Sequence, residues 1–137
     1  MQYRSTRGES PAVSFSEALL AGLAPDGGLV VPQSYPRVDD ATLAAWRGLT
    51  YPQLAFEILS CYAGDIAPET LRALIERTYT ADVFGNAQIT PVLGLEDELW
   101  LLQLSNGPTL AFKDVAMQLL GNLFEHVLSA RGQQLNI

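Results

Sequence analysis

The residue with the clearest chemical potential is Lys113, the only lysine among the 137 residues of the chain. All other basic residues are arginines, whose guanidinium keeps its proton in proteins. A lysine amine, in contrast, can lose its proton and attack a carbonyl carbon. Since the chain uses arginine for every other positive charge, we interpret Lys113 as a candidate nucleophile toward a carbonyl group.

The residues around Lys113 predict a turn that leads into a helix. The segment 106–108, Asn-Gly-Pro, favours a turn, and its proline also suits the first position of a helix. A helical pattern begins at Thr109 or Phe112 and continues to Arg131. Gly132 then supplies a stop signal. The lysine is therefore expected in the first turn of this helix.

The two faces of this predicted helix differ in polarity. At about 100° per residue, Lys113 shares a row with apolar residues and lies away from the polar stripe. The apolar row contains Met117, Leu120 and Phe124, and the polar stripe contains Asp114, Gln118, Asn122, Glu125 and Ser129. We expect Lys113 to point into the protein, where burial and the helix N-terminus both disfavour an ammonium group. The alternative is a lysine whose stem covers apolar surface while its amine stays in water.

Composition excludes several classes of function. The net charge of −7 gives no basic patch, so neither nucleic acid nor an anionic membrane surface is an expected partner. The chain has no apolar run of about 18–20 residues and no signal peptide, so we expect a cytoplasmic protein. One cysteine and one histidine are too few for a Cys/His zinc site. We expect Cys61 to be a core thiol and His126 to lie partly exposed on the helix surface.

The first part of the chain predicts a small α+β domain, which we place at residues 1–90. Turn signals, helix caps and apolar periodicity define its elements. The expected elements are strands at 2–6 and 29–31, and helices that begin near Ser14, Asp39, Thr50 and Pro68. Residues 85–91 are interpreted as a linker.

The second part, residues 91–137, predicts the beginning of a different domain. We expect an acidic turn at 95–98, a buried strand at 99–104, the lysine helix, and a new strand at 135–137. Strand, helix and strand open a βαβ unit, whose parallel strands need neighbours and cover on both faces. The expected fold class is therefore α/β, a small α+β domain followed by the incomplete start of a parallel-sheet domain. We expect the chain to be part of a longer protein.

A family resemblance supports this organisation. The segment from Gly107 to Gln118, GPTLAFKDVAMQ, is very similar to the pyridoxal-phosphate lysine motif of the threonine synthase family. The segments 3–8, 13–16 and 26–29 resemble the N-terminal domain of that family. The resemblance therefore extends over the whole chain but covers only the first part of a family member.

The resemblance implies a lyase of threonine biosynthesis in which Lys113 forms a Schiff base with pyridoxal 5'-phosphate. The implied reaction converts O-phospho-L-homoserine and water to L-threonine and phosphate. The lysine amine would serve as general acid and base, and the cofactor ring would accept electrons. Family members commonly carry an aromatic residue and a histidine where this chain has Ser105 and Asn106, so no role of that histidine is transferred.

Two other interpretations stay open. One is another lysine-bearing enzyme of the same cofactor fold, such as a dehydratase or a cysteine synthase relative. The other is a non-catalytic interaction domain that retains the lysine. Because the 137 residues contain no Ser/Gly/Thr-rich loop for a phosphate group, we expect this chain alone neither to hold the cofactor tightly nor to turn over substrate. The sequence does not specify an oligomeric state.

Overall fold

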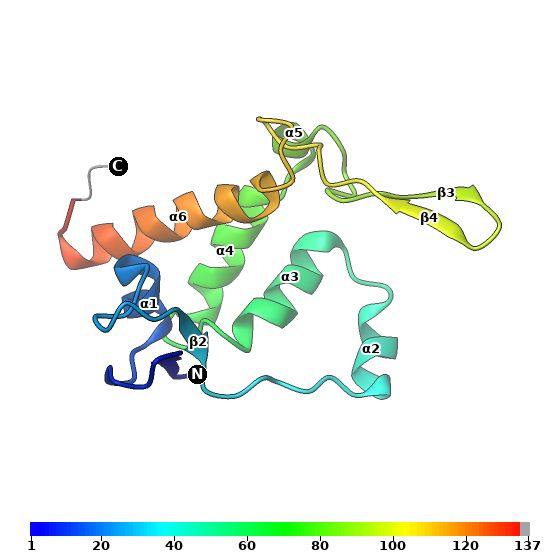
Figure 1. The fold of residues 1–137 in the computed structure, drawn as a ribbon. Coiled ribbons are helices and arrows are strands. Elements are labelled where there is room, and N and C mark those ends of the chain that lie inside the picture. Colours follow the sequence, from blue (N-terminus) through cyan, green and yellow to red (C-terminus); the bar gives the residue numbers. More distant parts are fainter. Residues whose placement is uncertain (135–137) are drawn as a thin grey trace. The chain divides into compact units, whose positions relative to one another are not determined.

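The computed structural model describes residues 1–134, and these form an α/β fold of short strands and helices (Figure 1). The chain divides into two compact units. The first comprises residues 1–48 and 54–72, and the second comprises residues 49–53 and the described residues from 73 onward. The α/β fold class predicted from the sequence is confirmed.

A two-stranded antiparallel sheet belongs to the first unit. Strand β1 (Tyr3–Ser5) pairs with β2 (Val30–Pro32). Tyr3 extends this pairing, because its N–H donates to the Val13 carbonyl oxygen at 2.8 Å and its own carbonyl accepts from the Val13 N–H at 2.9 Å. Tyr3 and Ser5 are buried, whereas the residue between them is exposed, as a strand with one covered face requires. Both predicted strands of this unit are confirmed.

The first two helices begin at the caps that the sequence predicts. Helix α1 (Phe15–Ala21) has a capping box, in which the Ser14 hydroxyl accepts from the Glu17 N–H and the Glu17 carboxylate accepts from the Ser14 N–H. Helix α2 (Asp40–Trp46) begins after Asp39, whose carboxylate accepts from a backbone N–H of the first turn at 2.8 Å. These local hydrogen bonds satisfy N–H groups that a helix start otherwise leaves unpaired.

Three further helices follow. They are α3 (Tyr51–Ser60), α4 (Pro68–Thr78) and the single-turn α5 (Ala81–Phe84). The first two are predicted, but α5 is not, because a single turn is too short to show a helical period. Cys61 follows α3 and is exposed, so the expectation of a core thiol is wrong. Its Sγ donates to a carbonyl of the preceding turn at 3.4 Å, which keeps it at the helix surface.

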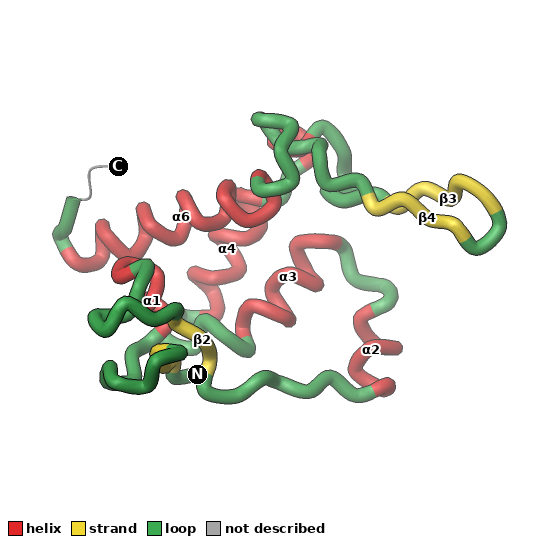
Figure 2. The backbone as a smooth tube through the Cα atoms, viewed as in Figure 1, coloured by secondary structure: helices red, strands yellow, loops and turns green. Residues whose placement is uncertain are grey.

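The second unit contains a hairpin that the sequence predicts only in part. Strand β3 (Val92–Glu96) pairs antiparallel with β4 (Leu99–Leu102), and Figure 2 shows the two as adjacent yellow segments joined by a short turn. Strand β4 is confirmed, whereas β3 includes part of the predicted acidic turn. Every residue of both strands is exposed, so the expected burial of 99–104 is wrong for β4. Its apolar residues predict burial, but no other described segment covers them.

The lysine helix is α6 (Asp114–Arg131). Its predicted end is confirmed, since Gly132 adopts φ 60° and its N–H donates to carbonyl groups of the last turn. Its start lies later than predicted, because residues 107–113 form turns in which Leu110 has φ 61°. A left-handed residue cannot continue an α-helix. The strand predicted at 135–137 lies outside the described residues.

None of the helices in the described part of the chain has the length and apolarity that crossing a bilayer requires.

The turn that follows α1 is held by Asp26. Its carboxylate accepts from the Ser5 hydroxyl at 2.6 Å, the Gly28 N–H at 2.9 Å and the Glu9 N–H at 3.1 Å. The hydrogen bond from Ser5 is the largest cause that lowers the pKa of Asp26 to about 2. Gly28 has no room for a Cβ, which would overlap the Ser5 hydroxyl. The Asp-Gly-Gly turn is thus built around one carboxylate.

The Asp26 carboxylate should make the stability of the chain depend on pH. The folded-state pKa of Asp26 is about 2 and lies below its ordinary value of 3.8. At a pH above 3.8, the ionised carboxylate therefore stabilises the folded state. This contribution is lost as the pH falls toward the folded-state pKa. For Asp26→Asn, we expect a lower urea midpoint at neutral pH and a weaker loss of stability on acidification. Circular dichroism during urea titration measures both.

The control is Asp97→Asn, which changes an exposed carboxylate in the β3–β4 turn. Equal pH dependence of the Asp26→Asn variant and the unmodified chain would contradict this role of Asp26.

Candidate functional site

Lys113 is the N-cap residue of α6, and its side chain is exposed. The expectation that it points into the protein is therefore wrong for the described structure. The reason is the orientation of α6, which buries Leu119, Leu123 and Val127. The row that Lys113 shares with Met117 faces away from them, and Met117 is 51% exposed. The amine lies in water, as the alternative interpretation expects.

Asp114 lies next to Lys113 in sequence but is only 3% exposed. One carboxylate oxygen accepts from the Thr109 N–H at 2.8 Å, and the Thr109 hydroxyl lies 2.9 Å from both oxygens. A buried carboxylate is costly unless hydrogen bonds replace its lost water. Its negative charge also suits the first turn of α6. Asp114 therefore fixes the turn before the helix to the start of the helix.

Gly107 completes this arrangement. It is buried, and a Cβ at this position would overlap the Asp114 side chain. The Gly107 carbonyl also accepts from the Leu110 N–H at 3.0 Å. Leu110 has φ 61°, a conformation that bulky residues rarely adopt. We define residues 107–114 as the lysine turn, whose shape depends on close contact between a glycine and a buried carboxylate.

Two partly buried hydrogen bonds anchor α6 within the second unit. The Tyr79 hydroxyl donates to the Val115 carbonyl oxygen at 2.8 Å. Burial, with a smaller effect of Tyr51, raises the pKa of Tyr79 far above its usual range, so this hydroxyl remains a neutral donor. The Asn122 amide donates to the Thr78 hydroxyl at 2.6 Å. The second bond involves Asn122, a member of the predicted polar stripe of α6.

The Asn106 amide before the lysine turn donates to the Ile89 carbonyl oxygen at 3.4 Å. This long bond to backbone agrees with a role in forming the turn, as the sequence indicates for Asn106.

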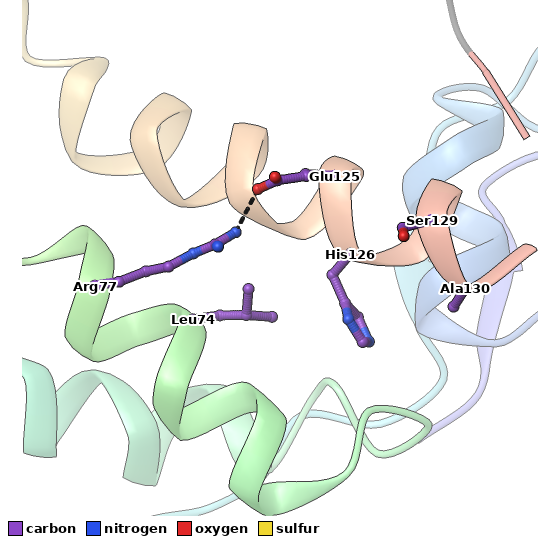
Figure 3. Close-up of a pocket in the computed structure, with 6 residues that line it drawn as sticks. All are labelled: Leu74, Arg77, Glu125, His126, Ser129 and Ala130. Atoms are coloured by element: carbon purple, nitrogen blue, oxygen red, sulfur yellow. Dashed lines mark hydrogen bonds and ion pairs between the residues drawn. The ribbon is translucent and has the colours of Figure 1, made fainter. Parts of the chain in front are cut away.

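A separate pocket lies beside α4 and α6, and Lys113 is not part of it. Its volume is about 430 Å³, and Figure 3 shows its lining residues, Leu74, Arg77, Glu125, His126, Ser129 and Ala130. The Arg77 guanidinium and the Glu125 carboxylate form an ion pair at 2.6 Å, with 48% and 70% of their side chains exposed. Exposed ion pairs contribute about 0–1 kcal/mol. His126 is half-buried, which agrees with its predicted place on the helix surface.

The pocket offers weaker chemistry than the lysine turn. Its two charged residues neutralise each other, and within the described residues no hydrogen bond joins the Ser129 hydroxyl to His126, as an activated nucleophile would require. Among the described residues, Lys113 remains the group best suited to covalent chemistry. Sequence reasoning placed Gly107 and Thr109 in the segment around Lys113 but missed their contacts with Asp114, because a Thr–Asp spacing of five does not match the three-residue spacing of a capping box.

Comparisons with known proteins cover the whole chain. A family model described as "Threonine synthase N terminus" matches residues 2–79. The chain is 57% identical to threonine synthase from Methylobacillus glycogenes, over 100% of this chain and 30% of that protein. It is 47% identical to threonine synthase from Pseudomonas aeruginosa, over 100% of this chain and 29% of that protein. The chain thus spans less than a third of the length of these relatives.

Solved structures agree with this result. The crystal structure of PLP-bound threonine synthase from Brucella melitensis matches with a TM-score of 0.93 and 41% identity, over 98% of this chain and 29% of that chain. Threonine synthase from yeast matches with a TM-score of 0.89 and 43% identity, over 98% of this chain and 28% of that chain.

Two glycines near Lys113 allow a test of the lysine turn. In Gly107→Ala the new methyl group overlaps Asp114, and we expect unfolding stability to fall by about 1–3 kcal/mol, as overpacking usually costs. Gly121 lies inside α6 with no atom within 4 Å of an added Cβ. Gly121→Ala should therefore raise stability by about 0.5–1 kcal/mol. Urea denaturation followed by circular dichroism compares the two, and changes of the same sign would contradict the proposed packing.

Proposed function

Because the chain belongs to the threonine synthase family, as the match of residues 2–79 to the family model shows, we propose that it forms the N-terminal part of a pyridoxal-phosphate-dependent threonine synthase. The proposed enzyme is a carbon–oxygen lyase that converts O-phospho-L-homoserine and water to L-threonine and phosphate. One observation carries this proposal. The only lysine of the chain lies in an ordered turn at a helix start, inside a match that spans the chain.

The chemistry of Lys113 fits pyridoxal phosphate. Within the described residues its amine has no hydrogen-bond or ion-pair partner, so it is free to react with an aldehyde. When bound, the cofactor would supply that aldehyde and an electron-accepting ring. The amine of Lys113 can also take a proton from a substrate carbon when it is deprotonated, and it can return that proton from its protonated form.

Asp114 has a structural role in the proposed site and does not itself react. Its two oxygens already accept from Thr109, so the carboxylate is not a free base. It fixes the lysine turn, and thereby the backbone from which Lys113 extends. Accurate placement of a reacting group is a major source of rate in enzymes.

We propose that residues 1–90 form the N-terminal domain and that residues 91–137 begin the cofactor-binding domain. We also propose that this chain alone is inactive. The exposure of Lys113 supports this, because reactions at such amines need a site from which water is excluded. The sequence also lacks a phosphate-binding loop.

A non-catalytic interaction domain is the second candidate function. The observation that favours it is the same exposure of Lys113, since an amine in water needs no catalytic role. The two candidates differ in whether Lys113 is required for activity once the rest of a threonine synthase is present.

A chimeric enzyme tests the proposed function. Residues 1–137 replace the matched region of the Methylobacillus glycogenes relative, which aligns with the whole of this chain. We expect the chimera to release phosphate from O-phospho-L-homoserine and to form threonine. Lys113→Ala should lower kcat by at least about 10²-fold, because it removes both the attachment point and the acid–base group. Phosphate release and threonine formation are measured together.

Lys113→Arg is the matched control, since it keeps the positive charge but cannot form the covalent bond. Full activity of either variant would contradict a catalytic role of Lys113. Threonine formation by the 137-residue chain alone would contradict the proposed inactivity.

A further inference from the structure

Tyr79 follows α4 and places its hydroxyl group against the start of the lysine helix. It belongs to the second compact unit, together with α6 and the lysine turn. The hydroxyl donates to the Val115 carbonyl oxygen at 2.8 Å, and Val115 is the second residue of α6, two positions after Lys113. A carbonyl oxygen has two lone pairs, so it can accept this bond in addition to the usual bond within the helix. The first turn of α6 is thus held by a residue that lies 36 positions earlier in the chain.

Aromatic packing holds the ring of Tyr79 in place. Tyr79 is 7% exposed. Its ring centroid lies 4.9 Å from that of Tyr51, edge to face, and 5.8 Å from that of the fully buried Phe84. The Tyr79 N–H donates to the Ile75 carbonyl oxygen at 3.0 Å, which ties its backbone to the end of α4. Because a tyrosine ring is placed by only two side-chain torsion angles, this packing leaves the hydroxyl little freedom to move.

The backbone of Lys113 is part of the turn that this hydroxyl contacts. The Lys113 carbonyl oxygen accepts from the Ala116 N–H at 3.0 Å and from the Met117 N–H at 2.8 Å. The lysine side chain, in contrast, makes no capping hydrogen bond and is exposed. The direction of the amine therefore depends on the backbone from which it extends. Asp114 holds the segment before α6 to that backbone, and Tyr79 holds the helical turn that follows it.

The residue before Tyr79 makes a second contact with α6, farther from the lysine. The Thr78 hydroxyl accepts from the Asn122 amide at 2.6 Å and donates to the Leu74 carbonyl oxygen at 2.6 Å. This contact lies about two turns farther along α6 than the contact of Tyr79, at 3.6 residues per turn. At that distance it stabilises the helix without holding the turn that carries the lysine. The two contacts therefore allow the stability of α6 and the placement of Lys113 to be tested separately.

We propose that Tyr79 is a positioning residue for Lys113, whose hydroxyl holds the first turn of α6 so that the lysine amine is placed for its reaction with the cofactor aldehyde. This inference rests on the proposed function. A displacement of about 1 Å can cost a reacting group about 10²-fold in rate, and hydrogen bonds from supporting residues prevent such displacement. The family model matches residues 2–79 and thus ends at Tyr79. The last residue of this N-terminal match would then act in the reaction at Lys113.

The test uses the chimeric enzyme that carries residues 1–137. Tyr79→Phe removes one hydroxyl and keeps the ring, so we expect the chimera to fold as before. We expect kcat to fall about tenfold while KM for O-phospho-L-homoserine changes less than about twofold, because the lost contact acts on the reacting amine and not on substrate binding. For the same reason, the apo chimera should take up pyridoxal phosphate about tenfold more slowly. Phosphate release and stopped-flow absorbance after mixing with the cofactor measure these changes.

Two further variants of the chimera are matched controls. Tyr51→Phe makes the same chemical change in the same aromatic cluster, but among the described residues the Tyr51 hydroxyl has no hydrogen-bond partner. Thr78→Val removes the second contact with α6 and should lower the melting temperature measured by circular dichroism. Both controls should keep kcat and the rate of cofactor uptake within about twofold of the unmodified chimera, because neither changes the turn that carries the lysine.

Amide hydrogen exchange of the apo chimera reports on the lysine turn independently of activity. In Tyr79→Phe, peptides that cover residues 110–119 should exchange faster than in the unmodified chimera, because local opening of this turn becomes easier. In Thr78→Val, faster exchange should instead appear in peptides around Asn122. Mass spectrometry of the peptides measures both.

The outcomes separate the positioning role from the proposed function. Full activity of Lys113→Ala would overturn the proposed function, whereas the following results concern Tyr79 alone. The positioning role would be overturned if Tyr79→Phe left kcat, cofactor uptake or exchange of residues 110–119 unchanged, or if it raised only KM. It would also be overturned if either control lowered kcat by the same factor. Loss of the folded circular dichroism spectrum in Tyr79→Phe would overturn it too, because the hydroxyl would then be required for folding.

Discussion

The contact between the buried Asp114 carboxylate and the Thr109 N–H and hydroxyl groups decides how Lys113 is presented. A carboxylate that is 3% exposed is tolerated because these donors replace water. The same carboxylate leaves room only for a glycine at position 107. With the first turn of α6 held this way, the helix buries Leu119 and Leu123, and the amine of Lys113 faces outward.

Local signals in the sequence predict the ends of elements well. The capping box at Ser14, the N-cap at Asp39, the proline that begins α4 and the glycine that ends α6 each act through neighbouring backbone groups, so a few residues specify them. Lys113 was found by its uniqueness, and the turn before it by its Asn-Gly-Pro segment. The family of the chain was identified from residues 107–118 together with three N-terminal segments, and the comparisons confirmed it.

The direction in which a residue faces was harder to predict. Periodicity assigns polar residues to the solvent, yet Asp114 is buried and Asn122 is half-buried, with their polar groups bonded to Thr109 and Thr78. These partners are distant in sequence or lie outside the usual cap spacing, so no local pattern reveals them. For β4 the error was the reverse, because residues that were predicted to be buried are exposed. Its leucines predict burial, but an apolar pattern specifies cover and not which polypeptide supplies it.

The central proposal is that the amine of Lys113 forms a Schiff base with the aldehyde of pyridoxal phosphate. Borohydride reduction of the chimeric enzyme in the presence of pyridoxal phosphate, followed by mass spectrometry of its peptides, tests this claim most directly. Since Lys113 is the only lysine in residues 1–137, label on any other lysine would come from the other parent of the chimera. The account predicts stoichiometric label on the peptide that contains Lys113. Label on a different lysine, with the Lys113 peptide unmodified, would contradict it.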